Sequence, residues 1–294
     1  MRCGFVALVG APNAGKSTLL NRMVGAKLSI VSPKAQTTRM RILGIVMQNQ
    51  TQILLMDTPG IFKPKRKLDE AMVASAWLGA AEADITALLI DVSSGLTDET
   101  LKIIEKLKEN PKRIWLILNK IDKIPAQKLL PLTEKIANIL PFEESFMISA
   151  RTGDGVTDLL NQLAEKLPEG PWLYPEDDLT NLPDRLLAAE LVREQIFLQT
   201  YEEIPYGTTV ETESFKERPD GSIRIDAVIY VGRANTKAII IGEKGQKIRA
   251  IGEKARKELC RLLDRPCHLF LNVKERKGWD SEKARLHAIG LDLT

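Results

Sequence analysis

A glycine-rich segment near the start of the chain has the composition of a phosphate-binding loop. The segment GAPNAGKS, residues 10–17, fits the pattern Gly-x-x-x-x-Gly-Lys-Ser. It follows an apolar run typical of a buried strand and opens STLLNRMVG, which is typical of a helix. Backbone N–H groups converge at such a helix N-terminus and would hold the phosphates of a nucleoside triphosphate. We expect Lys16 to reach the β- and γ-phosphates and Ser17 to give its hydroxyl to Mg²⁺.

The segment NKID, residues 119–122, indicates which base is bound. The Asp122 carboxylate can accept hydrogen bonds from both N1–H and the exocyclic amine of guanine, whereas adenine has no such donor pair. Asn119 is expected to support the base edge and the first loop, and the aliphatic stem of Lys120 to lie along the ring. In SAR, residues 149–151, the Ala150 N–H would donate to guanine O6. Together these motifs predict GTP.

Two further segments predict a magnesium site that senses the γ-phosphate. In DTPG, residues 57–60, Asp57 would hold the ion through water and the Gly60 N–H would meet the phosphate. KAQTTRMR, residues 34–41, is expected to be a mobile loop that gives Mg²⁺ a second hydroxyl. Thr37 and Thr38 are both candidates, and we favour Thr38. Because loss of the γ-phosphate would release both segments, the sequence favours a switch over a metabolic hydrolase.

The candidate residues of the nucleotide site fall into three groups. The catalytic candidates are Lys16, Thr38 and Gly60, and the metal candidates are Ser17, Thr38 and, through water, Asp57. The residues expected to bind GTP all lie in the motifs above: Gly10, Ala11, Pro12, Asn13, Ala14, Gly15, Lys16, Ser17, Thr18, Asp57, Thr58, Pro59, Gly60, Asn119, Lys120, Asp122, Ser149 and Ala150.

The residue after Gly60 departs from the Ras-like pattern. It is Ile61, where Ras and Gα proteins have a glutamine that orients the attacking water. Intrinsic hydrolysis is therefore expected to be slow and to depend on another group or on a partner.

A second glycine loop lies in IIIGEKGQKIRAIG, residues 239–252. Residues 233–261 hold nine basic and three acidic side chains, so their local charge of +6 exceeds the +3 of the whole chain. A Gly-x-x-Gly loop between two helices that clamps about four nucleotides is the KH device, and nearby isoleucines would pack the helices and wall a groove. The alternative is a basic face that binds an acidic protein partner. The RNA-binding candidates are Lys237, Ile241, Gly242, Glu243, Lys244, Gly245, Lys247, Ile248 and Arg249.

The surrounding elements predict two domains of different architecture. Short apolar runs at residues 5–10, 53–57, 85–92, 113–120 and 144–150 alternate with amphipathic segments, which is the βαβ pattern of a mainly parallel sheet in an α/β domain. After the prolines and acids of residues 171–183 the expected order becomes α-β-β-α-α-β, an α+β arrangement that fits a type II KH domain. We therefore predict a nucleotide domain at 1–170, a linker at 171–183 and an RNA-binding domain at 184–294.

Composition limits the other possibilities. The 294-residue chain is 44% hydrophobic and 28% charged, and no segment approaches the ~18 uninterrupted apolar residues of a membrane span. Its three cysteines are too few and too scattered for a disulfide framework or a zinc site, which favours a reducing cytosol. An RNA-modifying enzyme is a weaker hypothesis, because the second half has no nucleophile or metal cluster and the whole chain has two histidines.

Over essentially the full length, these motifs resemble the Era family of bacterial ribosome-assembly GTPases. The resemblance rests on GAPNAGKSTLLN, KAQTTR, MDTPG, NKID, ISARTG, IPYGTTVE and IIGEKGQKIRAIGEKARKEL followed by LNVKERKGW. It implies that the KH domain binds the 3′ end of small-subunit ribosomal RNA and that GTP gates action on the maturing small subunit. It further implies a hydrophobic residue at Ile61, a potassium ion linked to Asn13, and a cytoplasmic protein with peripheral contact to the inner membrane. We expect a monomer.

Overall fold

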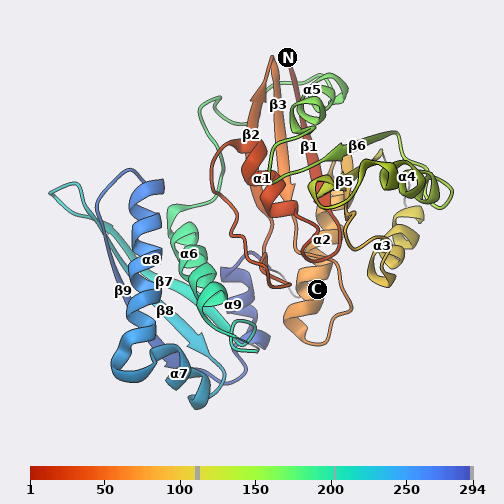
Figure 1. Cartoon of the computed structure of the whole chain (residues 1–294). Coiled ribbons are helices and arrows are strands. Elements are labelled where there is room, and N and C mark those ends of the chain that lie inside the picture. Colours follow the sequence, from red (N-terminus) through yellow and green to blue (C-terminus); the bar gives the residue numbers. More distant parts are fainter. Residues whose placement is uncertain (110–112, 202, 292–294) are drawn as a thin grey trace. The chain divides into compact units, whose positions relative to one another are not determined.

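The computed structural model describes residues 1–109, 113–201 and 203–291, and the chain divides into two compact units (Figure 1). Unit 1 comprises Met1–Ser29, Thr38–Asn181 and the described residues of Gly290–Thr294. Unit 2 comprises Ile30–Thr37 and Leu182–Ile289. The short segment 30–37 therefore belongs to unit 2, although the chain on both sides of it belongs to unit 1.

Unit 1 is built on a six-stranded sheet. Its strands are β1 (Arg2–Val9), β2 (Ile42–Gln48), β3 (Thr51–Asp57), β4 (Ile85–Asp91), β5 (Ile114–Asn119) and β6 (Glu144–Ile148), in the order β2-β3-β1-β4-β5-β6. All neighbours are parallel except β2 and β3. The five predicted strands and the mainly parallel sheet are confirmed.

The edge strand β2 was not predicted. It forms an antiparallel hairpin with β3 through a tight turn in which Asn49 has a φ of 56°. Asparagine tolerates this left-handed conformation, so the apolar run 42–47, followed by Asn49 and a second apolar run, is a hairpin signal. The predicted loop covers residues 34–41 only, and residues 42–48 have no predicted element.

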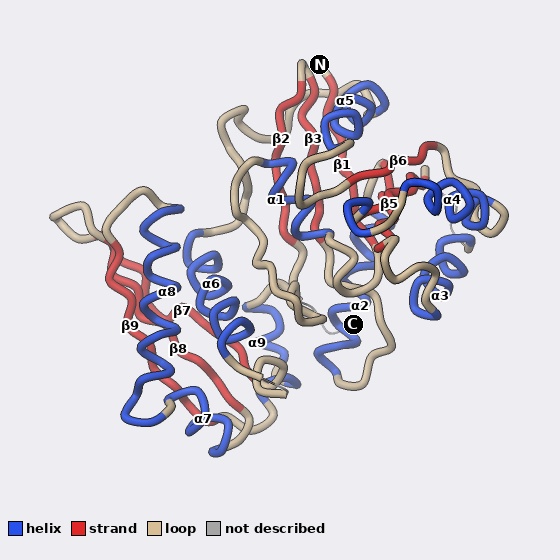
Figure 2. Tube along the Cα trace, in the orientation of Figure 1, coloured by secondary structure: helices blue, strands red, loops and turns tan. Residues whose placement is uncertain are grey.

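Helices cover both faces of this sheet (Figure 2). They are α1 (Lys16–Val24), α2 (Lys67–Glu82), α3 (Asp98–Lys108), α4 (Leu129–Ala137) and α5 (Val156–Lys166), with short 3₁₀ turns at Ile121–Lys123 and Ala126–Lys128. Alternate strand residues such as Val9, Met56 and Ile90 form one core with buried residues of α2, α3 and α4. On the opposite face α1 packs so closely that a Cβ at Gly44 would lie 2.7 Å from Leu20.

The carboxyl ends of the parallel strands meet at one edge of the sheet, where ligands bind in open α/β folds. The first glycine loop follows β1, Asp57 ends β3, Asn119 ends β5, and Ser149 follows β6. The topology therefore brings together motifs that are up to about 140 residues apart in the sequence.

Residues 171–181 lie along the strands of unit 1. The Gln52 side chain accepts hydrogen bonds from the Leu173 and Tyr174 amides at 2.8 and 3.1 Å, and the Ile45 N–H donates to the Leu179 carbonyl at 2.8 Å. Most of the predicted linker, residues 171–181, therefore packs with unit 1.

Unit 2 packs helices against a three-stranded sheet. In chain order its elements are α6 (Asp184–Gln199), β7 (Thr208–Glu217), β8 (Ile223–Val231), α7 (Ala234–Ile241), a 3₁₀ turn at Glu243–Gly245, α8 (Gln246–Leu262), β9 (Cys267–Glu275), a 3₁₀ turn at Trp279–Ser281 and α9 (Lys283–Ala288). The sheet order is β7-β8-β9, with β7 antiparallel and β9 parallel to β8. Helices α6 and α8 lie side by side (Figure 1). The predicted α-β-β-α-α-β order is confirmed.

Candidate nucleotide and RNA sites

The first glycine loop wraps closely around the start of α1. Gly15 has a φ of 100°, and a Cβ there would lie 2.2 Å from the Asn119 amide nitrogen, so both backbone and space require glycine. That nitrogen donates to the Ala14 carbonyl at 2.8 Å, which ties the loop to the end of β5. The structure thus brings the phosphate-binding loop and the NKID segment into contact through Asn119, as expected.

Lys16 is buried beneath this loop. Its Nζ donates to the carbonyls of Gly10 and Ala11 at 3.0 and 2.9 Å. Burial lowers the pKa of Lys16 to about 8, although the nearby Asp57 acts in the opposite direction. A phosphate would stabilise the charged ammonium, because it supplies the negative charge that the buried loop lacks.

Three oxygen-bearing side chains converge beside Lys16 to form a cluster suited to a hard cation. The Ser17 hydroxyl donates to Asp57 Oδ2 at 2.6 Å and lies 2.8 Å from Thr38 Oγ1. Asp57 is fully buried, and its other oxygen, Oδ1, has no hydrogen-bond partner. Burial raises the pKa of Asp57, while hydrogen bonds from Ser17 and Ser29 oppose the increase. Hydroxyl and carboxylate oxygens with one buried oxygen left open fit Mg²⁺ with its water ligands.

The two candidate threonines lie in different places. Thr38 belongs to unit 1 and faces Ser17 and Asp57, whereas Thr37 belongs to unit 2. Thr37 Oγ1 lies 2.6 Å from Ser32 Oγ and donates to the Lys34 carbonyl at 2.8 Å. Only Thr38 therefore has its hydroxyl in the oxygen cluster.

The guanine-selective motifs form a connected group at the ends of β5 and β6. Asp122 accepts from the Ser149 hydroxyl at 2.7 Å and from Arg151 at 2.7 Å. The hydrogen bond from Ser149 lowers the pKa of Asp122; burial opposes this shift, and the charge of Arg151 lowers the pKa further. The Ala150 amide donates to Asn119 Oδ1 at 3.0 Å. The Asp122 carboxylate is thus ionised. Arg151 donates a hydrogen bond to Asp122 Oδ2, one of the two oxygens that guanine would use.

Sequence reasoning missed Asp91 at the end of β4. Lys120, held at a φ of 69°, donates through Nζ to Asp91 Oδ2 at 2.5 Å and to the Asn13 carbonyl at 2.7 Å. Burial raises the pKa of Asp91, but the hydrogen bonds from Lys120 and Ser93 outweigh it and lower the pKa overall. Asp91 thus fixes the lysine whose stem was expected to lie along the base. The position of Asp91 at the carboxyl end of a parallel strand was the sequence signal that could have identified it.

The DTPG segment is held against the first loop. The Thr58 hydroxyl donates to the Leu8 carbonyl at 2.7 Å, and a Cβ at Gly60 would lie 2.8 Å from the Pro12 Cα. Ile61 donates its N–H to the Gly10 carbonyl at 3.1 Å, and its side chain is buried in the core formed with α2 and α3. The Thr58 side chain therefore holds the DTPG segment against β1, and Ile61 is a core residue.

The second glycine loop forms the turn between α7 and α8. Gly242 has a φ of 72°, and a Cβ there would lie 2.6 Å from the Lys247 Cβ. Gly245 has a φ of 77° with open space around it, and Lys244 has a φ of 48°. Glu243 and Lys244 are exposed. The loop thus presents backbone and one cation to solvent, as a phosphate-backbone clamp requires.

The nearby isoleucines divide into two groups. Ile240 and Ile251 are fully buried in the core of unit 2, while Ile241 and Ile248 are only partly buried at its margin. The first pair holds α7 and α8 together, and the second pair is left to wall a groove. Lys247 Nζ donates to the Gln199 carbonyl at the end of α6, at 3.0 Å.

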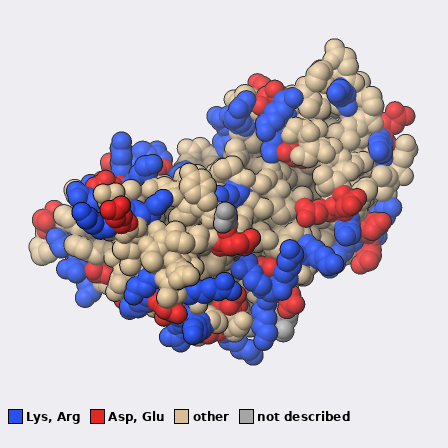
Figure 3. Space-filling model, turned by 60° about the horizontal axis from the view of Figure 1, so that its bottom comes forward, with Lys and Arg blue, Asp and Glu red and all other residues tan. Residues whose placement is uncertain are grey.

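Basic and acidic side chains are interspersed over much of the visible surface (Figure 3). In α8, Arg249 pairs with Glu253 at 3.1 Å and Arg261 with Glu258 at 2.8 Å. Within the described part of the chain, Lys244 forms no ion pair with an acidic side chain. The charge excess around the loop therefore depends on a few lysines more than on the arginines of α8.

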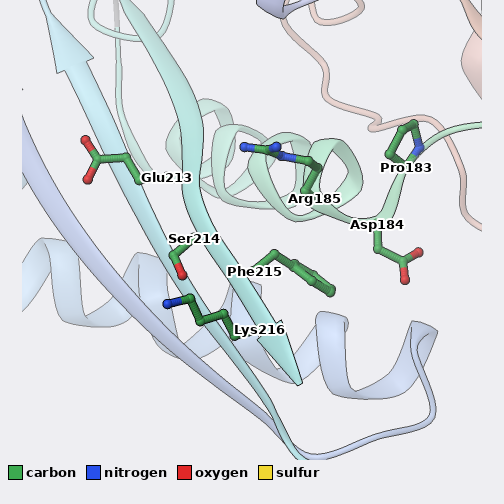
Figure 4. A pocket seen from close by; sticks show the side chains of 7 residues that line it. All are labelled: Pro183, Asp184, Arg185, Glu213, Ser214, Phe215 and Lys216. Carbon is green, nitrogen blue, oxygen red and sulfur yellow. The ribbon is translucent and has the colours of Figure 1, made fainter. Parts of the chain in front are cut away.

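A separate hollow in unit 2 lies between the start of α6 and β7 (Figure 4). It is lined by Pro183, Asp184, Arg185, Glu213, Ser214, Phe215 and Lys216. Arg185 donates to the Thr212 carbonyl at 2.8 Å, so its guanidinium stabilises the contact between α6 and β7. None of the motif residues lines this hollow.

Among the described residues, no helix is long and apolar enough to cross a membrane.

Comparison with known proteins gives matches to both units. Residues 5–120 match the family of 50S ribosome-binding GTPases, and residues 203–280 match the KH domain family. The chain is 53% identical over 292 residues to GTPase Era of Rhizobium meliloti, covering 99% of this chain and 93% of the relative. It is 52% identical over 295 residues to GTPase Era of Dinoroseobacter shibae, covering 99% and 96%.

Two solved structures match the whole chain. One is a variant of Aquifex aeolicus Era bound to GDP and AlF₄⁻, and the other is Era in complex with MgGDPNP and nucleotides 1506–1542 of 16S ribosomal RNA. Each matches with a TM-score of 0.94 and 42% sequence identity, and each match covers 99% of this chain and 99% of the solved chain.

Proposed function

The chain belongs to the family of GTPase Era, and from that premise we propose that it is a GTP-controlled switch that binds the 3′ end of small-subunit ribosomal RNA. Unit 1 would bind and hydrolyse GTP, and the KH unit would hold the RNA during maturation of the small ribosomal subunit. The observation that carries the proposal is the pair of glycine loops, one above the oxygen cluster of Asp57 and one between α7 and α8. The relative with bound 16S ribosomal RNA supports it.

We assign the nucleotide site to the motif residues of unit 1. Lys16 would bind the β- and γ-phosphates, Ser17 and Thr38 would give their hydroxyls to Mg²⁺, and Asp57 would hold its water ligands. Bound Mg²⁺ supplies charge neutralisation for the phosphates. Asp122 would select guanine, and the Gly60 N–H would sense the γ-phosphate. The domain division at 1–170, 171–183 and 184–294, a cytoplasmic monomer, a peripheral membrane contact and a potassium ion at Asn13 remain part of the proposal.

A comparison of the two neighbouring threonines tests the magnesium assignment. Thr38→Val is expected to weaken Mg²⁺-dependent retention of a GTP analogue at least about tenfold, because one direct hydroxyl ligand is lost. Thr37→Val removes a hydroxyl that contacts Ser32 and Lys34 instead, so it should leave the magnesium dependence unchanged. The measurement is the dissociation rate of a fluorescent GTP analogue over a range of Mg²⁺ concentrations. An unchanged rate in Thr38→Val would refute the assignment.

Because Ile61 is buried, we expect its replacement to lower the stability of the protein and to change the rate of GTP hydrolysis little. Ile61→Ala should lower the free energy of unfolding by about 2–5 kcal/mol, because it removes core methyl groups and leaves a cavity. The single-turnover rate of GTP hydrolysis, measured well below the melting temperature, should change little, since the side chain packs in the core. A large loss of rate in a variant that is still folded would place Ile61 in the catalytic machinery.

RNA binding by the basic loop predicts a steep salt dependence. With about four phosphates contacted, the affinity for a single strand should fall by ~3 log units for each tenfold rise in salt. The probe is an RNA of nucleotides 1506–1542 of 16S ribosomal RNA, measured by fluorescence anisotropy. An affinity that stays flat between low and high salt would contradict the proposal and favour the alternative, an acidic protein partner.

A further inference from the structure

We propose that Cys260 and Cys267 form a reversible redox site in unit 2, at which a hydroperoxide converts the two thiols into a disulfide. This chemistry requires neither GTP nor RNA. In the sequence the two cysteines are scattered residues without the spacing of metal ligands. The structure brings them into contact.

The two cysteines lie where α8 ends and β9 begins (Figure 1). Cys260 is in the last turn of α8, and Cys267 is the first residue of β9. The Cys267 N–H donates to Cys260 Sγ at 3.2 Å, so the sulfur of one cysteine lies against the backbone of the other. A disulfide forms readily only between cysteines that the backbone already places side by side, and this pair meets that condition.

The surrounding fold holds the two residues in place. The Pro266 carbonyl accepts a hydrogen bond from the Ile223 N–H at 2.9 Å, which fixes the start of β9 to β8. Cys267 is buried in a core that also contains Leu259 from the last turn of α8. Cys260 packs against the same core. The contact between the two cysteines is therefore part of the packed unit and does not depend on a loose loop.

The two thiols differ in exposure, which gives them different roles. Cys260 is partly exposed, so a small peroxide in solution can reach its sulfur, whereas Cys267 is only 3% exposed. Burial raises the pKa of the Cys267 thiol to about 11, and the adjacent Cys260 thiol acts in the same direction. Cys267 therefore stays protonated at neutral pH and is a poor first target for an oxidant. We assign the first oxidation to Cys260 and the second step to Cys267.

The reaction uses hydrogen peroxide as its oxidant and has two steps. The Cys260 thiolate attacks one peroxide oxygen, the O–O bond breaks, and the hydroxide that leaves takes up the proton of the Cys260 thiol to give water. The Cys267 sulfur then attacks the sulfur of the Cys260 sulfenic acid. An S–S bond forms as the S–O bond breaks, and the Cys267 proton leaves with the hydroxyl group as a second water. The two thiols are thus oxidised by two electrons, and the peroxide is reduced.

A disulfide of this kind is compatible with a reducing cytosol. Cytosolic disulfides are usually transient and redox-sensing, because dithiol reductants return them to thiols by exchange. The bond also has a protective effect, since a sulfenic acid that has condensed with a thiol is no longer oxidised to the irreversible sulfinic acid. We therefore expect Cys267 to keep Cys260 recoverable after exposure to peroxide.

The test treats the full-length protein with hydrogen peroxide, blocks the remaining thiols with iodoacetamide and analyses tryptic peptides by mass spectrometry without reduction. Trypsin cuts after Arg261 but not between Arg265 and Pro266, so the two cysteines fall in peptides 258–261 and 262–274. We expect these peptides to be joined with the loss of two hydrogen atoms, and dithiothreitol to separate them. Thiols that stay free, or that are oxidised singly without joining the peptides, would overturn the proposal.

Single variants test the separate roles. In Cys267→Ser, the Cys260 sulfenic acid has lost its partner, so it should react with dimedone or pass to a sulfinic acid that dithiothreitol does not reverse. In Cys260→Ser, the buried Cys267 should remain a thiol. Cys3→Ser, which removes the cysteine of unit 1, is the matched control and should keep the full yield of joined peptides. If Cys260 is as recoverable in Cys267→Ser as in the unaltered protein, Cys267 does not resolve the sulfenic acid and the proposal fails.

Discussion

Asp122→Asn is expected to lower the affinity for GTP by about 10²–10⁴-fold, because the exocyclic amine of guanine loses its acceptor and faces the amide N–H, while the hydrogen bond from N1–H loses its charged partner. Xanthosine triphosphate should bind the variant better than GTP does. Its C2 carbonyl can accept from the new amide N–H, while its N1–H still finds an oxygen. The measurement is competition of both nucleotides against a fluorescent GDP analogue.

The matched control for this change is Asp158→Asn in the exposed first turn of α5. It removes the same charge from the same unit without touching the base-binding motif, so it should leave both affinities unchanged. Equal binding of GTP by Asp122→Asn and by the unaltered protein would show that the carboxylate does not read guanine.

Gly245→Asp is expected to weaken RNA binding by about 10²-fold, because it places a carboxylate where the phosphate backbone would approach. Gly245 has a φ of 77° and open space, so aspartate fits there without a clash. The chain offers a close control in Gly221→Asp. Gly221 lies between β7 and β8, has a φ of 79° and is equally open. Both variants add one charge and the same backbone strain.

The two variants should therefore have similar melting temperatures and different RNA affinities. Anisotropy titrations with the 1506–1542 RNA measure the second quantity, and GTP-analogue binding should be unchanged in both. Equal RNA affinities for Gly245→Asp and Gly221→Asp would mean that the loop is not the clamp.

Much of the nucleotide site could be predicted from the sequence because parallel strands end at one edge. Each motif follows a strongly apolar run, so the strands and their carboxyl ends were recognisable, and the sheet then placed Asp57, Asn119 and Ser149 together. Gly15 was predictable from the motif, and the structure supplies the reason: its missing side chain is replaced by the Asn119 amide.

The remaining contacts depend on tertiary structure that local patterns do not encode. Asp91 meets Lys120 only because β4 and β5 are neighbours in register. Ser29 reaches Asp57 only because Asn21 fixes the Ser29 backbone. A short segment such as 30–37 has too few residues to show any periodicity, so its membership of unit 2 could not be inferred from its sequence.

The most direct test of a GTP-controlled RNA switch is crosslinking in cell extract followed by RNA sequencing, performed with a GTP analogue and with GDP. We expect reads to concentrate at the 3′ end of small-subunit ribosomal RNA and to be more abundant with the GTP analogue. Gly245→Asp should lose this enrichment, and Gly221→Asp should keep it. Crosslinks that show no preference for this RNA, or an equal yield in both nucleotide states, would contradict the account.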